Sequence, residues 1–234
     1  MIQYKDVYKQ YGEKHNALSN VSVDIDDGEF VFLIGSSGAG KTTFLKLLIR
    51  EILPSKGHII IDGTEINKIP KTKVHLLRRK IGMVFQDFKL LTDRTVFENV
   101  AISLEILGKE TKNIEKEVKD VLELVDLSNK SNLFPKELSQ GEMQRTSIAR
   151  AIVGGPKILL ADEPTGNLDP DTSWQIVEIL KEIHKIGTTI IMATHNERIV
   201  NEMKLRTIML SRGKIESDDT KGKYHIPHAK KHEN

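Results

Sequence analysis

The chain has 234 residues, no cysteine, and 35 lysines and arginines against 33 aspartates and glutamates, which leaves a formal net charge of +2. This length suits one domain with a subdomain, because single hydrophobic cores stop growing near roughly 250 residues. The near-neutral charge argues against nucleic-acid binding, and the lack of cysteine excludes disulfides and thiolate metal sites. No apolar run approaches the roughly 18 residues of a membrane span, and the first residues lack the apolar centre of a signal peptide. We therefore expect a cytoplasmic protein that can still dock on a membrane protein.

Two segments near the start of the chain alternate between apolar and polar side chains with a period near two. These segments, residues 2–8 and 18–26, predict antiparallel strands. Tyr11 lies between them in a predicted Tyr-Gly turn. A third, apolar strand is expected at residues 30–34, and it leads directly into a glycine-rich loop.

The glycine-rich loop fits the spacing G-x-x-x-x-G-K-[ST] and is followed by an apolar helix that begins at Lys41 and runs to Ile49. A strand, a glycine loop and a helix in this order form a phosphate cradle, because successive backbone N–H groups and the helix start converge on one anion. Lys41 would reach the outer phosphates and Thr42 would face a magnesium ion. The predicted phosphate-binding residues are Gly35, Ser36, Ser37, Gly38, Ala39, Gly40, Lys41, Thr42 and Thr43.

The middle of the chain changes from strands to helices. Strands are expected at residues 58–63 and 81–85, with a short basic helix at 74–80 between them, and Gln86 follows the second strand. Helical periodicity then marks residues 96–107, 114–125 and 139–153. We interpret residues 88–156, approximately, as a helical subdomain inserted between strands of a single domain that covers residues 1–234.

Two acids end the next predicted strand. Residues 158–163 form an apolar strand that closes in Asp162 and Glu163, and a carboxylate at this edge of a parallel sheet is the expected magnesium ligand. A helix from Asp169 follows, then a strand at 188–193 that ends near His195, and residues 206–210 and 213–215 predict a final strand or hairpin. Residues 216–234 are expected to form a polar, mobile tail. Strands that alternate with helices predict an α/β fold with a mainly parallel core sheet.

Several motifs, taken in their order along the chain, resemble the nucleotide-binding domain of the ATP-binding cassette (ABC) family over residues 1–215. The motifs are the glycine loop, Gln86, Leu138-Ser139-Gln140-Gly141-Glu142, Asp162-Glu163, Asn167-Leu168-Asp169 and His195. The resemblance implies a P-loop NTPase fold with antiparallel N-terminal strands and an inserted helical subdomain. It also implies that the chain binds and hydrolyses ATP.

The resemblance assigns the nucleotide and the metal to particular side chains. Tyr11 would stack on adenine, and Lys41 with the loop amides would hold the phosphates. Thr42, Gln86 and Asp162 would hold Mg²⁺ directly or through water. Phosphoryl transfer asks mainly for positioning and charge neutralisation, which these groups supply.

The resemblance also assigns the catalytic residues. Glu163 would orient the attacking water, His195 would contact the terminal phosphate, and Lys41 would neutralise charge. Asp169 and the signature residues Ser139, Gln140 and Gly141 would complete a nucleotide site across a nucleotide-dependent homodimer. The family usually has glycine where this chain has Gln140, and because a side chain restricts positive φ, we expect slower turnover.

Residues 77–96, 172–174 and 192–196 resemble the cell-division members of the family most closely. Those members work on the inner face of the cell membrane with an integral membrane subunit and control cell-wall hydrolases. Lipoprotein-releasing or peptide-exporting ATPases share most of the motifs, and soluble members that act on DNA or ribosomes are a third possibility. An apolar cluster beside Gln86, formed by Phe85, Phe88, Leu90 and Leu91, either docks the membrane subunit or packs inside the protein.

Overall fold

The computed structural model describes residues 1–12 and 15–224. Of His15 it describes the backbone only. An antiparallel sheet forms the N-terminal part, with the strand order β2-β1-β4-β5. Its strands are β1 (Ile2–Tyr11), β2 (His15–Ile25), β4 (Lys56–Ile61) and β5 (Thr64–Glu65). The predicted antiparallel strands are confirmed. Strand β1 is longer than expected, so Tyr11 is the last residue of the strand and does not lie in a turn.

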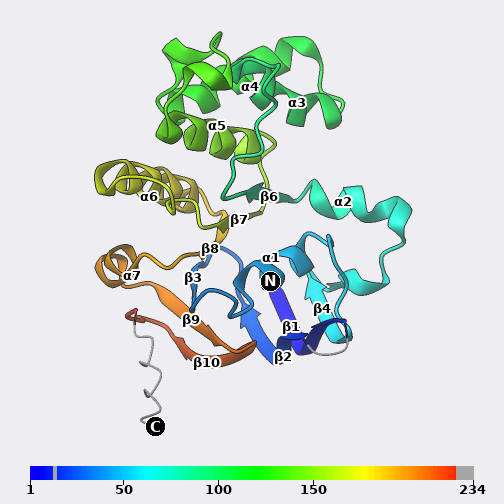
Figure 1. Cartoon of the computed structure of the whole chain (residues 1–234). Helices are drawn as coiled ribbons and strands as arrows, with labels where there is room; N and C mark the ends of the chain where they lie inside the picture. The colour runs from blue at the N-terminus through cyan, green and yellow to red at the C-terminus, as the bar shows by residue number, and fades with distance from the viewer. Residues whose placement is uncertain (13–14, 225–234) are drawn as a thin grey trace.

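A second sheet of six strands lies at the centre, with the order β10-β9-β3-β8-β7-β6 (Figure 1). Neighbours from β9 to β6 run parallel, and β10 is antiparallel to β9. The parallel strands place their carboxyl ends at one edge, where α/β proteins bind ligands. The strands are β3 (Phe30–Ile34), β6 (Ile81–Val84), β7 (Ile158–Asp162), β8 (Thr189–Ala193), β9 (Arg206–Ser211) and β10 (Lys214–Asp219).

Some helices lie near the sheets, and the others form a separate group. Figure 1 shows α3, α4 and α5 gathered at one end of the molecule, beyond α6. Among the described residues, no helix has the length and apolar character needed to span a membrane. The helices are α1 (Lys41–Leu48), α2 (Val74–Arg78), α3 (Val96–Ile106), α4 (Thr111–Leu124), α5 (Gln140–Ile152), α6 (Pro170–Lys185) and α7 (Glu197–Met203).

The central strand β3 is buried on both faces. Phe30, Phe32 and Ile34 belong to a core that continues through α6 into helices α3 to α5. Val31 and Leu33 alternate with them and belong to a second core with α1 and the antiparallel sheet. A strand with apolar partners on both sides tolerates no slip in register, so the loop that follows β3 is fixed in place.

The end of the described chain differs from the predicted tail. Residues 216–219 complete β10 instead of starting a mobile segment, because Asp218 pairs with Arg206 of the neighbouring strand. An edge strand can be polar when its side chains find charged partners, which is why its composition suggested a tail. Residues 220–224 of the predicted tail follow β10 and are described, whereas residues 225–234 lie outside the described residues.

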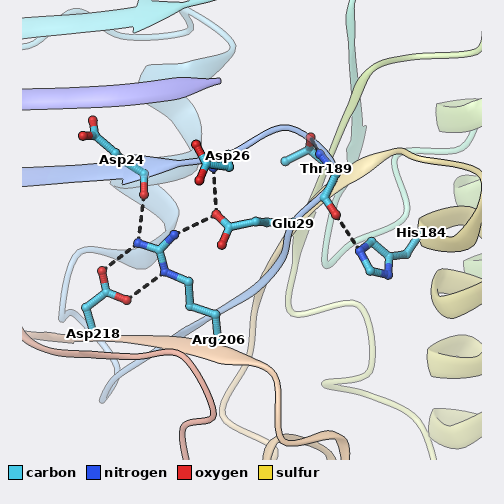
Figure 2. A network of polar contacts seen from close by, with 8 residues as sticks. Asp24, Asp26, Glu29, His184, Thr189, Arg206 and Asp218 are labelled. Atoms are coloured by element: carbon cyan, nitrogen blue, oxygen red, sulfur yellow. Dashed lines mark hydrogen bonds and ion pairs between the residues drawn. The ribbon is translucent and has the colours of Figure 1, made fainter.

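Arg206, the first residue of β9, links both sheets (Figure 2). Its guanidinium donates to both carboxylate oxygens of Asp218, at 2.9 and 2.7 Å, to Glu29 Oε2 at 2.7 Å, and to the Asp24 carbonyl at 2.8 Å. Only 16% of the Arg206 side chain is exposed. The network therefore joins β2, β9, β10 and the residue just before β3. His184 adds a bond of 2.8 Å from α6 to the Gly28 carbonyl.

Replacing Arg206 by methionine should lower the free energy of unfolding by about 2–4 kcal/mol, because two carboxylates would lose a partly buried partner. Urea denaturation followed by circular dichroism measures this. The matched control is Lys185→Met, which breaks an exposed pair with Glu182 and should cost less than about 1 kcal/mol. Similar losses in the two variants would show that the Arg206 network is not a main tie between the sheets.

Candidate nucleotide-binding site

The glycine-rich loop connects β3 to α1 and is closely surrounded by backbone. Gly35 has φ 149°, and a Cβ there would lie 2.3 Å from the Leu210 carbonyl oxygen. Gly40 has φ 112°, and a Cβ there would lie 2.6 Å from the Ala17 carbonyl oxygen. Only glycine fits both the conformation and the space. Because α1 has no side-chain cap, its first N–H groups are left for another acceptor.

Lys41 is a buried cation that the loop holds. Its Nζ donates to the Gly35 carbonyl at 2.7 Å and to the Ser36 carbonyl at 3.4 Å, and it lies 3.5 Å from Glu163 Oε1. Lys41 is 8% exposed, so its charge needs a partner, and Glu163 supplies one. The ammonium group is thus fixed at the bottom of the loop.

Oxygen ligands gather beside the loop at the end of β7. Thr42 Oγ1 donates to Asp162 Oδ1 at 3.3 Å, and Gln86 comes two residues after the end of β6. Burial raises the pKa of the Asp162 carboxyl above its ordinary value. A hydroxyl, a carboxylate and an amide, with space left for phosphate and water, are the ligands that suit Mg²⁺. The three predicted metal ligands therefore fit that ion.

Glu163 adopts a left-handed backbone conformation, with φ 51°. Its N–H donates to the Ala193 carbonyl at 2.9 Å, which ties the residue to the end of β8. The carboxylate accepts hydrogen bonds from the backbone N–H of His195 at 3.2 Å and from its Nδ1 at 2.7 Å. Since Nδ1 is the donor, Nε2 of His195 can bind another partner.

A cavity of about 570 Å³ joins these groups. It brings together all nine predicted loop residues, Gln86, Glu163 and His195, and Asp162 is connected to it through Thr42. Ala17 and Tyr224 also line it and were not predicted. No sequence motif could have pointed to Tyr224, because it follows β10 in a segment that appeared to be a tail.

The remaining predicted site residues do not line this cavity. Ser139 caps α5, and its hydroxyl accepts the Glu142 N–H. Asp169 caps α6 by accepting the Thr172 N–H at 3.0 Å, and these bonds lower the pKa of its carboxyl. Tyr11 lies at the end of β1 and is 40% exposed.

The positive φ expected at Gln140 is absent from the structure. Gln140 is the first residue of α5 and does not have a positive φ, so its side chain causes no backbone strain. The close approach in this segment is at Gly141, where a Cβ would lie 2.5 Å from Thr172 Cγ2 and the threonine side chain would have to move. Gly141 therefore lets α5 approach the start of α6, and the reason given for slow turnover is wrong.

A groove of about 620 Å³ lies between α2, β6, α3 and α5. Phe85 and Ile106 supply apolar surface, and Arg150 lines it from α5. The Arg150 guanidinium donates to the Phe88 carbonyl at 2.8 Å and to the Lys89 carbonyl at 2.7 Å. Phe88 and Lys89 have φ 58° and 52°, so Arg150 stabilises an unfavourable conformation in the loop that carries Gln86.

Comparison with known proteins identifies the class. The ABC transporter family profile matches residues 18–166. A solved structure of a dimeric ATP-binding cassette, in a post-hydrolysis state with ADP and Pi, superposes with a TM-score of 0.87 at 33% identity, over 96% of this chain and all of that one. The chain therefore belongs to the ABC transporter family, and the predicted ABC ATPase fold is confirmed.

Among named relatives, the chain resembles the cell division ATP-binding protein FtsE of Bacillus subtilis. The two are 52% identical over 224 residues, which cover 96% of this chain and 98% of FtsE. The methionine import ATP-binding protein MetN of Carboxydothermus hydrogenoformans is 46% identical over 218 residues, which cover 92% of this chain and 65% of MetN. The predicted resemblance to the cell-division members of the family is confirmed.

Replacing Asp162 by asparagine should have opposite effects on stability and on binding. The raised pKa of Asp162 means that folding favours its neutral form, so this contribution to stability is present at acidic pH and is lost as pH rises through the raised pKa. Asparagine is neutral at every pH and can still accept the Thr42 bond. Thermal unfolding at pH 7.5 without nucleotide should therefore show a higher midpoint than the wild type.

The same variant should bind ATP at least about tenfold more weakly when Mg²⁺ is present, because a charged metal ligand is lost. Nucleotide titrations with Mg²⁺ and with a chelator measure this. Asp120→Asn, an exposed change on α4, should alter neither property. An unchanged dependence of affinity on Mg²⁺ would contradict the metal assignment.

Proposed function

We propose that the chain is the ATP-hydrolysing subunit of a membrane complex in bacterial cell division. It works as a nucleotide-dependent homodimer at the inner face of the cell membrane, docks on an FtsX-like integral membrane protein, and passes nucleotide-driven motion to it to control cell-wall hydrolases. The observation that carries the proposal is the convergence of Lys41, Glu163 and His195 on one cavity. The similarity to FtsE supports the cell-division role.

The phosphates of ATP bind in the glycine loop. The loop N–H groups and Lys41 hold them, as the loop geometry and the uncapped start of α1 suggest. Thr42, Gln86 and Asp162 hold Mg²⁺, which supplies neutralisation of phosphate charge when it is bound. Tyr11 stacks on the adenine ring, in keeping with its exposed position.

Hydrolysis transfers the terminal phosphoryl group to water. Glu163 accepts a hydrogen bond from the attacking water and orients it, while His195 uses Nε2 to contact the terminal phosphate. The bond between the γ-phosphorus and the oxygen that it shares with the β-phosphate breaks as the bond to the water oxygen forms, and both protons of the water leave with the inorganic phosphate, so that ADP and phosphate result. The hydrogen bond of 2.7 Å from His195 keeps the carboxylate of Glu163 in one orientation.

Ser139, Gln140 and Gly141 act on the nucleotide held by the second copy, and Asp169 lies at the same interface. These residues stand at the starts of α5 and α6, away from the cavity of their own chain. Backbone N–H groups and a hydroxyl at a helix start suit a phosphate. The dimeric cassette to which the chain is similar supports this arrangement.

The membrane subunit docks in the groove that Phe85 and Ile106 line. Ile106 is 66% exposed there, and Arg150 runs from the groove to the loop that carries Gln86. An apolar helix from the partner would bury this surface and contact the loop at the same time. Of the apolar cluster beside Gln86, Phe85 lines the groove, Phe88 and Leu90 are half-buried, and Leu91 is 38% exposed.

The alternative is a transport ATPase, such as a lipoprotein-releasing or peptide- or drug-exporting one. The similarity to MetN favours a transport role in general. The discriminating observation is the membrane protein that co-purifies in detergent: a permease that stimulates ATP hydrolysis only with its substrate would favour transport.

Replacing Glu163 by glutamine should lower the rate of ATP hydrolysis at least about a hundredfold, because the residue that orients the water loses its charge. Affinity for ATP should stay within about threefold, because the amide oxygen of glutamine can still accept a hydrogen bond from Lys41 and the loop is unchanged. Steady-state phosphate release and equilibrium titration measure the two quantities. The matched control, Glu115→Gln on the exposed face of α4, should leave both unchanged. Turnover at the wild-type rate would remove Glu163 from the mechanism.

Replacing Ile106 by glutamate should weaken capture of the FtsX-like subunit at least about tenfold, because a charge would enter the apolar groove. Detergent pull-down with the co-expressed subunit measures capture, and ATP binding by the variant should stay normal. Ile186→Glu is the matched control, because Ile186 is 80% exposed at the end of α6, outside the groove. If both variants capture the subunit equally well, the groove is not the docking site.

A further inference from the structure

The chain turns back toward the nucleotide cavity after β10. The Gly222 N–H donates to the Leu205 carbonyl at 3.1 Å, and Gly222 lies so close to Thr207 that a Cβ would come within 2.4 Å of its side chain. Two residues later, the Tyr224 N–H donates to Asn201 Oδ1 at 2.8 Å. These bonds fix residues 222–224 against α7 and the start of β9.

This return places a phenol in the wall of the nucleotide cavity. Tyr224 is half-buried, packs against the core that contains α6, and lines the same cavity as Lys41, Glu163 and His195. Burial, followed by the negative charges of Glu197 and Glu163, raises the pKa of its hydroxyl. The group therefore stays a neutral hydrogen-bond donor at physiological pH.

The groups around the Tyr224 hydroxyl restrict the kind of ligand that it can bind. The cavity already holds a cation, a carboxylate that accepts from His195, and a loop of backbone donors, which together suit a polyphosphate. A neutral donor in the same wall complements phosphate oxygens without adding charge. We infer that Tyr224 is a substrate-contacting residue whose hydroxyl donates to the terminal phosphate of bound ATP. The inference rests on the proposed function.

The anchor of Tyr224 ties this contact to His195. Asn201 belongs to α7, and Asn196, the residue after His195, caps the start of that helix by accepting the Ile199 N–H at 3.2 Å. The same short helix therefore starts two residues after His195 and holds the Tyr224 backbone through Asn201. Asn201 is therefore a positioning residue, because it holds the backbone of Tyr224 and so keeps the phenol in the cavity wall.

The test compares a triphosphate with a diphosphate in the full-length chain. Tyr224→Phe retains the ring and its packing, and should weaken binding of Mg²⁺ with the slowly hydrolysed analogue AMP-PNP about tenfold, as expected for a lost hydrogen bond to a charged acceptor. Binding of ADP should change less than about twofold. The KM for ATP should rise while kcat stays within about twofold. Asn201→Ala should shift triphosphate affinity in the same direction, and Tyr8→Phe, an exposed control on β1, should shift neither.

Three results would overturn the inference. Equal losses of triphosphate and diphosphate affinity would make Tyr224 a general part of the wall, and no loss would make it a bystander. Faster turnover in Tyr224→Phe would make the residue a cover over the site. A wild-type chain that binds neither nucleotide would instead defeat the proposed function, so the two failures are distinguishable.

Discussion

The contact between Lys41 and Glu163 is the interaction on which the site depends. Lys41 begins α1 and Glu163 follows β7, so their contact of 3.5 Å joins the glycine loop to the neighbouring edge of the sheet. Both side chains are nearly buried, and each would be an uncompensated charge without the other. The bonds from His195 bring the end of β8 to the same point. One cation and one carboxylate thus bring three strand ends together.

Two structural links connect this centre to distant surfaces. Arg150 holds the loop of Gln86 by the Phe88 and Lys89 carbonyls and lines the groove between α2 and α5. On the other side, α7 begins two residues after His195, and its residue Asn201 anchors the backbone of Tyr224. Contacts therefore lead from the cavity both to the groove between α2 and α5 and to residues 222–224.

The sequence could predict the parts whose chemistry is local. The spacing from Gly35 to Thr42 requires a phosphate loop, and an apolar strand that ends in Asp162-Glu163 requires the ligand edge of a sheet. It could not predict contacts that depend on how distant segments pack. Tyr224 enters the cavity through bonds to Asn201 and Leu205, and Arg206 makes β10 an ordered strand. The short helix α7 was missed because seven residues carry too little periodicity. Gln140 was misjudged because its backbone follows from the capping of α5 by Ser139.

The most direct measurement of the central claim is an equilibrium titration of the full-length chain and its Lys41→Met variant with Mg²⁺ and AMP-PNP. The account predicts that the wild type binds one nucleotide per chain and that the variant binds at least about a hundredfold more weakly, because the phosphates lose their cation and Glu163 is left unpaired in the cavity. A wild type that does not bind, or a methionine variant that binds equally well, would contradict the claim that the Lys41–Glu163 pair builds an ATP site.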